Sequence, residues 1–152
     1  PLIGMPLGVL NCEFSNVEDL TPLREMPLYS LTLNYTKVSD LSVLRGMNLV
    51  GFGCAATSVT DISPLKGMPI EALSFHTTRI ADPSPLQGMK LKELLCYGTN
   101  VSNYSLLKEM PLKLISFDFD PMRDTELLRS IKTLESINDK PAAEFWKDVE
   151  SR

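Results

Sequence analysis

His76, Tyr97 and Asp118 are the residues of this 152-residue chain whose types could support acid–base chemistry, and they follow one another at intervals of 21 residues. A general acid or base needs a pocket that excludes water and a second group that orients it. An open sheet that presents these side chains on successive strands offers neither, and a lone histidine has too few companions to bind a metal. We therefore predict that the chain is not an enzyme and needs no metal or other cofactor.

Three cysteines, as a residue type, could instead support redox or zinc chemistry. Cys12, Cys54 and Cys96 are separated by 42 residues each, which is two repeats. On alternate strands of a sheet spaced about 4.8 Å apart, their Cα atoms would lie roughly 9.6 Å from one another. A disulfide reaches only about 7 Å between Cα atoms. The same inward position holds Leu33 and Phe75 on other strands, so we interpret the cysteines as small buried apolar residues.

The elements that position these residues follow from a short phrase that recurs every 21 residues. A period without slippage is typical of a solenoid, in which each unit is one coil stacked on its neighbours. We assign residues 1–120 to six such repeats and residues 121–152 to a C-terminal cap. The copies of the phrase are Met5-Pro6-Leu7, Met26-Pro27-Leu28, Met47-Asn48-Leu49, Met68-Pro69-Ile70, Met89-Lys90-Leu91 and Met110-Pro111-Leu112.

Each repeat predicts a short strand followed by a turn-like return. In the second coil Leu31 and Leu33 alternate as in a half-buried strand, and the spacing then widens to Leu41, Leu44 and Met47. About five residues are left for the return, so we expect a single 3₁₀ or α turn there. One isolated coil buries too little apolar surface to fold, so neighbouring coils must share a core and a ladder of backbone hydrogen bonds.

The returns carry their own capping pattern. In the third coil Asp61 or Ser63 can cap the turn. Because each coil supplies one such carboxylate, capping explains this column of aspartates better than calcium binding does. Pro83, Asn103 and Tyr104 replace the usual residues of two later coils, and we expect distorted returns in both.

After Phe119 the repeat breaks. Residues 124–131 continue from a capping segment without glycine or proline, which predicts a helix. Residues 134–137 repeat the strand spacing once more and predict one last short edge strand. A final helix, capped by Asn138 or its neighbour, is predicted to run through Val149. We expect this helix, edge strand and helix to cover the open end of the core.

Side chains that alternate with the core leucines face the hollow side of the sheet, where we place the candidate binding residues. In the third coil Gly51, Gly53, Ala55 and Ala56 leave the strand almost bare, which suggests a shallow trough for a side chain or strand of a partner. Glycine could equally serve there only to relieve crowding. The mixed, mildly acidic and aromatic composition of the face suits protein or peptide recognition. The candidate partner-binding residues are Asn11, Glu13, Asn34, Tyr35, Gly53, Ser74, His76, Glu93, Tyr97 and Asp118.

Composition argues against two kinds of partner. The formal net charge is -4 and lysine and arginine form no cluster, so we expect no binding to nucleic acid. No apolar run approaches the roughly 18 residues that a membrane span needs, so we expect no membrane insertion. Residues 1–4 show no secretory signal and the chain begins inside a repeat, so we expect it to be part of a longer protein. The sequence indicates neither a compartment nor an oligomeric state.

The consensus L-x-x-L-x-L-x-x-T-x-V-x-D-L-S-P-L-x-G-M-P resembles the leucine-rich repeat, and in particular the short bacterial class that includes the internalin-like repeats. The resemblance covers residues 1 to about 120. It implies an α/β solenoid, a right-handed leucine-rich repeat superhelix with parallel strands on its concave face, short 3₁₀ or turn returns and a C-terminal helical cap. Where many such repeats carry asparagine after the strand, Ser15, Thr36 and their counterparts would bond to neighbouring backbone.

The closing phrase, residues 128–147, resembles the carboxyl-terminal end of leucine-rich tails attached to bacterial serine/threonine protein kinases. The resemblance carries over no catalytic residue, since nothing in this chain matches a Gly-rich phosphate loop, a catalytic His-Arg-Asp or an Asp-Phe-Gly. Our leading hypothesis is a non-enzymatic module that binds a protein or peptide. The alternatives are a sensing or scaffolding tail of such a kinase, and structural packing or adhesion at a cell surface.

Overall fold

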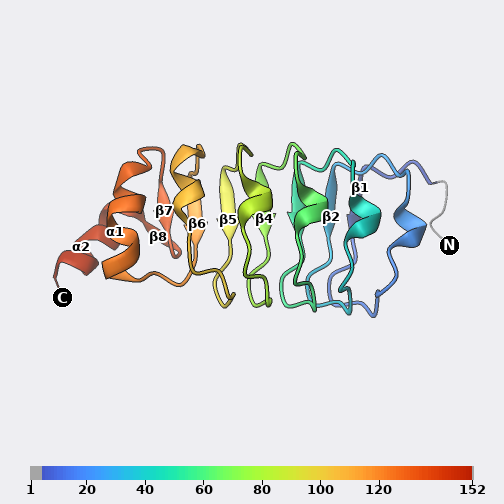
Figure 1. Cartoon of the computed structure of the whole chain (residues 1–152), viewed down its shortest axis with the longest axis horizontal. Coiled ribbons are helices and arrows are strands. Elements are labelled where there is room, and N and C mark those ends of the chain that lie inside the picture. Colours follow the sequence, from blue (N-terminus) through green and yellow to red (C-terminus); the bar gives the residue numbers. More distant parts are fainter. Residues whose placement is uncertain (1–4, 152) are drawn as a thin grey trace.

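The computed structural model describes residues 5–151 and shows an elongated stack of coils (Figure 1). Residues 1–4, on which the prediction about a secretory signal depends, lie outside the described residues. Within the described range, each of the first six coils contributes a three-residue strand to a single sheet. These strands are β1 (Val9–Asn11), β2 (Ser30–Thr32), β3 (Gly51–Gly53), β4 (Ala72–Ser74), β5 (Glu93–Leu95) and β6 (Leu114–Ser116).

The strands pair in chain order and in parallel, and the register advances by one repeat at each step from β1 to β6. Leu31 in β2 lies opposite Phe52 in β3, and Phe52 lies opposite Leu73 in β4. These central residues are buried, because alternate side chains of a strand point to opposite faces of the sheet. Residues one repeat apart are therefore neighbours in space, and the predicted leucine-rich repeat solenoid is confirmed.

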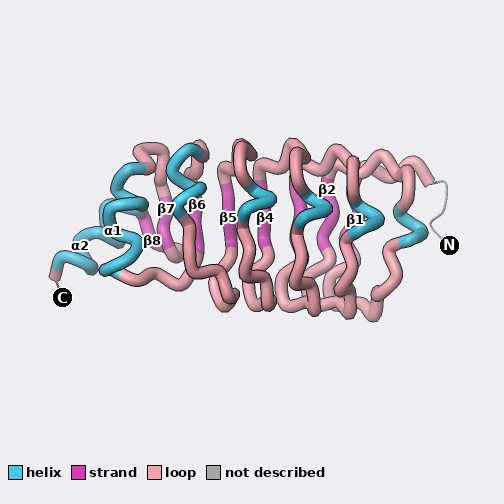
Figure 2. The backbone as a smooth tube through the Cα atoms, viewed as in Figure 1, coloured by secondary structure: helices cyan, strands magenta, loops and turns pink. Residues whose placement is uncertain are grey.

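A 3₁₀ turn forms the return of each of the first five coils, on the side of the stack away from the strands (Figure 2). In the third coil the Asp61 carboxylate accepts the backbone N–H of Ser63 at 2.7 Å and its hydroxyl at 2.8 Å. Asp19, Asp40 and Asp82 accept the same two bonds in their own coils, so the capping prediction is confirmed. The turns are η1 (Thr21–Leu23), η2 (Ser42–Leu44), η3 (Ser63–Leu65), η4 (Ser84–Leu86) and η5 (Ser105–Glu109).

The distortion expected at Pro83 is wrong. Pro83 has φ -87° and ψ 0°, close to the -105° and 12° of Ile62 at the same position of the preceding coil, and η4 keeps its three-residue length. The fixed φ of proline suits this position, which explains why the substitution leaves the return unchanged. The fifth return does differ, since η5 has five residues, although Asn103 still accepts the N–H of Ser105 at 2.8 Å.

A turn with one left-handed residue follows each of the first five strands, at Phe14, Tyr35, Ala56, Thr77 and Gly98, with φ between 52° and 63°. Residues other than glycine are uncommon in this conformation. The next residue holds the turn, because its hydroxyl donates to the carbonyl three residues earlier in the same coil. These bonds, 2.5 to 2.8 Å long, join Ser15 to Cys12, Thr36 to Leu33, Thr57 to Cys54, Thr78 to Phe75 and Thr99 to Cys96. The predicted bonding of these hydroxyls to backbone is confirmed.

The cysteines belong to the core that runs along the stack. Cys54 and Cys96 are fully buried free thiols, and burial raises the pKa of each to about 12. Cys12, on the first coil, is half-buried, and partial burial raises its pKa as well. The interpretation of the cysteines as small apolar core residues is thus confirmed for Cys54 and Cys96.

The chain departs from the repeat after β6. Helix α1 starts three residues before the predicted position, because Asp120 caps it by accepting the N–H of Met122 at 2.8 Å. Where one edge strand was predicted, two short strands form, and β8 runs antiparallel to β7. The division of the chain at residue 120 into repeats and cap stays a prediction. The elements after β6 are α1 (Pro121–Ser130), β7 (Ser136–Ile137), β8 (Lys140–Pro141) and α2 (Ala142–Glu150).

Aromatic packing covers the C-terminal end of the core. Phe119 meets Phe145 edge to face with ring centroids 5.0 Å apart, and Phe145 meets Trp146 in the same way at 5.3 Å. The Arg129 guanidinium lies 4.3 Å from the centroid of the Trp146 ring, a cation–π contact. Helix α2 thus places its aromatic residues over the last coil, where the stack would otherwise expose its core.

Candidate binding surface

Strands β1 to β6 and the turns that follow them position the ten predicted binding residues on or beside the concave face, because residues flanking each buried strand centre point away from the core. Asn11, Tyr35, Glu93, Tyr97 and Asp118 are exposed to solvent. The remaining five are half-buried or, in the case of the glycine, buried, and they are Glu13, Asn34, Gly53, Ser74 and His76. Their role in binding stays a prediction.

The bare third strand forms part of a hollow of about 230 Å³ in the concave face. Four of the ten predicted residues line this hollow, namely Asn34, Gly53, Ser74 and Glu93. A second hollow of about 280 Å³ lies beside it and shares the residues Ser30, Gly51, Ala72 and Glu93 with the first. The concavity therefore runs along β3 from the start of the strand to its end, and we name the two hollows together the trough.

Gly53 also relieves crowding. A Cβ atom at this position would lie 2.9 Å from Oδ1 of Asn34, which is closer than a real Cβ contact. Asn34 cannot move away freely, because the same Oδ1 accepts the backbone N–H of Ala55 at 2.8 Å and its Nδ2 donates to Glu13 at 3.4 Å. At Gly51 the nearest atom to an added Cβ is 3.4 Å away. Crowding thus explains Gly53, whereas a Cβ at Gly51 would meet the Ser30 side chain at ordinary contact distance, so Gly51 leaves room for a partner without being required by packing.

Two stacked aromatic pairs stand on either side of the third coil. The rings of Phe14 and Tyr35 are 4.6 Å apart between centroids and inclined by 14°, and those of His76 and Tyr97 are 4.4 Å apart and inclined by 11°. The stacking follows from the repeat, since each pair joins positions 21 residues apart on adjacent coils. Phe14, which the sequence analysis did not select, is 74% exposed. Its place one repeat before Tyr35 is the signal that could have identified it.

His76, Tyr97 and Asp118 do not form an acid–base constellation. The Asp118 carboxylate accepts the backbone N–H of Gly98 at 2.7 Å, and the His76 ring instead stacks on Tyr97 and lies 3.3 Å from the Thr77 hydroxyl. Partial burial lowers the pKa of His76 below its ordinary value of 6.5. The imidazole is therefore mostly neutral at pH 7 and serves here as a flat, weakly polar surface.

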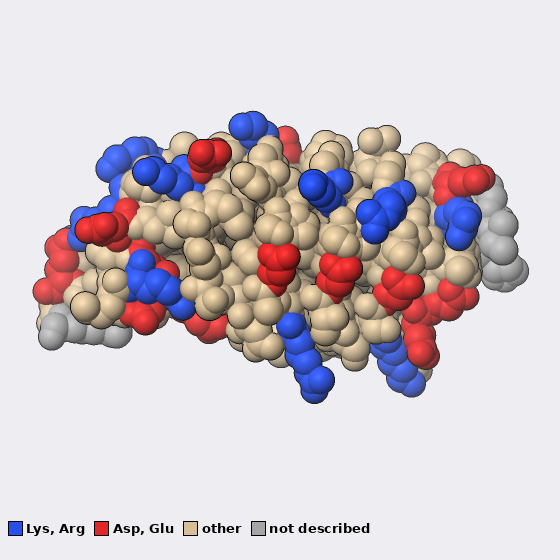
Figure 3. All heavy atoms as spheres, viewed as in Figure 1, with Lys and Arg blue, Asp and Glu red and all other residues tan. Residues whose placement is uncertain are grey.

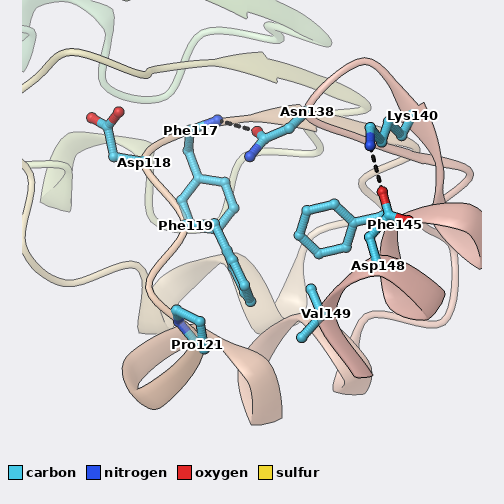
Figure 4. Close-up of a pocket in the computed structure, with 9 residues that line it drawn as sticks. All are labelled: Phe117, Asp118, Phe119, Pro121, Asn138, Lys140, Phe145, Asp148 and Val149. Atoms are coloured by element: carbon cyan, nitrogen blue, oxygen red, sulfur yellow. Dashed lines mark hydrogen bonds and ion pairs between the residues drawn. The ribbon is translucent and has the colours of Figure 1, made fainter. Parts of the chain in front are cut away.

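A larger hollow, of about 740 Å³, opens between the end of the sixth coil and helix α2 (Figure 4). The rings of Phe119 and Phe145 line it, the ion pair of Lys140 with Asp148 borders one side, and the Asp118 carboxylate points away from the rings on the other side. Of the ten predicted binding residues only Asp118 lines this hollow, because the hollow forms where the repeat ends and residues no longer fall into columns.

Within residues 5–151, no three histidine, cysteine or acidic side chains come together as metal ligands. None of the helices described is both long and apolar enough to cross a membrane.

The parallel strands, the 3₁₀ returns and the constant period define a leucine-rich repeat fold, and solved structures of internalins have a similar fold. The chain is similar to an internalin (inlF) of Listeria monocytogenes, with 28% identity and a TM-score of 0.75, over 86% of this chain and 40% of that one. It is also similar to an internalin C2 of the same organism, with 24% identity and a TM-score of 0.69, over 74% of this chain and 52% of that one. The chain thus spans about half or less of either protein. No protein-family model and no curated protein sequence matches it.

Proposed function

We propose that this chain is a non-enzymatic binding module that takes a protein or peptide on the concave face of its sheet. The observation that carries the proposal is the trough along β3, which interrupts an otherwise regular row of side chains between two stacked aromatic pairs. A groove with exposed aromatic side chains on the neighbouring coils is typical of a surface that receives a segment of another protein.

The trough is preformed. Phe52 and Leu73, which lie directly beneath it, are 3% and 2% exposed, and the strands on both sides are joined by parallel backbone pairing. A rigid surface loses little conformational entropy when a partner binds, so more of the contact energy appears as affinity. Tyr35 and Tyr97 add apolar area with a hydroxyl at its end, which suits a partly wet interface.

The test fills the trough and measures binding. Peptides selected from a random peptide library against the chain would be measured for affinity against Ala72→Trp, because Ala72 lines both hollows. The matched control is Thr60→Trp, at an exposed position of the third coil between β3 and η3. We expect Ala72→Trp to weaken binding at least tenfold and Thr60→Trp to leave it within twofold. Equal affinities for both variants, with melting temperatures preserved, would refute the concave face as the binding surface.

A triple variant provides an independent measurement. Tyr35→Ala, His76→Ala and Tyr97→Ala together remove ring area from both sides of the trough without filling it. We expect a further loss of affinity for the same peptides, and unchanged affinity would show that the aromatic pairs take no part.

The second candidate function is that of a sensing or scaffolding tail of a bacterial serine/threonine protein kinase. It derives from the resemblance of residues 128–147, which in this structure span the end of α1, β7, β8 and most of α2. The reading frame of the parent gene tests it directly. A kinase domain with its phosphate loop and catalytic aspartate in the same frame would support this candidate, and a frame without one would remove it.

A further inference from the structure

The charged side chains that stand in the columns of the concave face are all acidic. Its three columns, which consist of the residues at 21-residue intervals from Val9, Asn11 and Glu13, contain Glu13, Glu93 and Asp118 and neither lysine nor arginine. The return side differs, because acidic and basic side chains both recur along it in rows (Figure 3). The three columns thus carry charge of one sign, on a chain whose net charge is -4. Lys92 and Glu71, which also line the second hollow of the trough, add one charge of each sign.

None of the three carboxylates forms an ion pair within residues 5–151. Glu13 accepts from the Asn34 amide at 3.4 Å, and Asp118 accepts from the backbone N–H of Gly98 at 2.7 Å, so both have neutral donors. Glu93 is exposed on the wall shared by the two hollows of the trough. The negative charge of the face is therefore not compensated from within the described part of the chain.

Cations beside the face are already paired. At the starts of the strands Lys92 bonds to Glu71 at 2.7 Å and Lys113 bonds to Glu135 at 2.9 Å, so this rim carries balanced charge. Lys92 and Glu71 line the second hollow of the trough, and their pairing leaves Glu93 as the uncompensated charge there.

The cations at the strand ends do not reach the carboxylates of the face either. Near Asp118, the Arg123 guanidinium donates to the Asp118 backbone carbonyl, and the buried carboxylate of Asp124, 2.6 Å away, balances its charge. Lys37 and Arg79 are exposed, but they follow the turn at the end of the strand and so lie outside the three columns.

Tyr97 and Asp118 together offer a site for one cation. One face of the Tyr97 ring stacks on His76 of the preceding coil, which leaves the other face toward the coil of Asp118. The Asp118 side chain turns back toward the fifth coil, because its Oδ2 bonds to the N–H of Gly98, next to Tyr97. A guanidinium can lie over an aromatic ring and pair with a carboxylate at the same time.

We propose that the partner segment is basic, an extended stretch of protein that carries arginine, with one guanidinium between Tyr97 and Asp118 and a second cation on Glu93. This inference rests on the proposed function and gives it a chemical class of ligand. Five coil spacings of about 4.8 Å separate Glu13 from Asp118, so about seven residues of extended chain, at roughly 3.3 Å each, cross the face. Complementary charge would speed the encounter and make the affinity depend on salt.

The probes are two fluorescein-labelled ten-residue peptides, one alternating alanine with arginine and one alternating alanine with glutamate. Fluorescence anisotropy with the full chain is measured at low and at high sodium chloride. We expect the arginine peptide to bind and its dissociation constant to rise at least tenfold with salt, and the glutamate peptide not to bind. Binding of both peptides, or of neither, would overturn the proposal.

Matched variants separate a local site from general attraction by net charge. Glu93→Gln and Asp118→Asn each remove one charge from the concave face, and asparagine keeps an acceptor for the N–H of Gly98. Glu126→Gln removes one charge from the exposed surface of α1. We expect the first two to weaken binding three- to tenfold and the third to leave it within twofold. Equal losses for all three would overturn the proposal.

The outcome is distinguishable from failure of the proposed function. If library peptides bind in a manner sensitive to Ala72→Trp but carry no excess of arginine or lysine, and ignore Glu93→Gln and Asp118→Asn, the basic partner is wrong and the concave site stands. If no peptide is sensitive to Ala72→Trp, the concave site itself fails.

Discussion

Acidic residues serve different purposes on the return side and on the strand side of the stack. On the return side, Asp61 and its counterparts each accept two hydrogen bonds from the serine or threonine two residues later, so the carboxylates are consumed in holding the coil. On the strand side Glu93 forms no ion pair within residues 5–151, so its charge is not used in holding the coil. The difference teaches that a residue repeated in every coil serves the fold, whereas one that breaks its column is a candidate for binding.

The largest expected effect comes from the core that both sides share. Leu65 is fully buried in the third return, and Leu65→Ala should cost about 3 kcal/mol in the free energy of unfolding, because it leaves a cavity that neighbouring coils cannot fill. Ser74→Ala on the concave face should change it by less than about 0.5 kcal/mol. Urea unfolding followed by circular dichroism measures both. A cost at Ser74 that matched the one at Leu65 would remove the distinction between structural and uncommitted positions.

On the return side, a residue that departs from the repeat should reduce the stability of the chain and take no part in binding. Glu25 has φ 65° at the position where Gly46, Gly67 and Gly88 have φ between 78° and 81°. Left-handed backbone costs residues other than glycine about 1 kcal/mol or more, so Glu25→Gly should stabilise the chain by about 1 kcal/mol. The reverse change, Gly46→Glu, should destabilise it by a similar amount. Thermal melting gives the sign of each change in stability. If both variants shifted the melting temperature in the same direction, the assigned cost of the left-handed backbone would be contradicted.

Removing one carboxylate from each side contrasts them directly. Asp61→Ala deletes the cap of the third return and should lower the free energy of unfolding by about 0.5 to 1 kcal/mol. Glu93→Ala should leave it unchanged within about 0.5 kcal/mol, because this carboxylate has no ion-pair partner in the described structure. Chemical unfolding of the pair under one buffer is the measurement, and a larger loss for Glu93→Ala would reverse the comparison.

The smallest effect is a difference in pH dependence. Burial lowers the pKa of His76 below 6.5, so its contribution to stability is complete above pH 6.5 and falls as pH drops toward the lower folded pKa. The backbone N–H and the hydroxyl of Ser63 lower the pKa of Asp61 below 3.8, so its contribution is present above pH 3.8 and is lost below that. In melting temperatures measured from pH 8 to 3, the upper slope should be smaller in His76→Gln and the lower slope smaller in Asp61→Ala, where Asp19 still contributes. An unchanged profile in either variant would contradict the corresponding assignment.

Much of the repeat region could be predicted because residues 21 positions apart occupy equivalent places in successive coils. The recurring methionine phrase aligns Leu31 with Phe52 and Leu73, and strand pairing in the structure follows that alignment. The capping aspartates and the hydroxyls after each strand could be recognised in the same way, from their type and period. Pro83 misled the prediction because a proline in place of leucine looks disruptive, whereas the local backbone already has the φ that proline requires.

The candidate site was predicted only in part. The sequence suggested a trough along the third strand from Gly51, Gly53, Ala55 and Ala56, and the two glycines line a hollow there, whereas neither alanine does. The pairing of Phe14 with Tyr35 was missed, since the left-handed turn that exposes both rings has no glycine to mark it.

The sequence by itself determined the period, the register and the inward and outward positions of the first six coils, because a stack of equal units makes every residue the neighbour of the one 21 positions away. Only the tertiary structure decided how side chains bend between coils, such as Asn34 lying over Gly53 and Asp118 turning back to Gly98. It also decided the shape of the hollow at α2, because contacts beyond the last repeat depend on packing in three dimensions and follow no period.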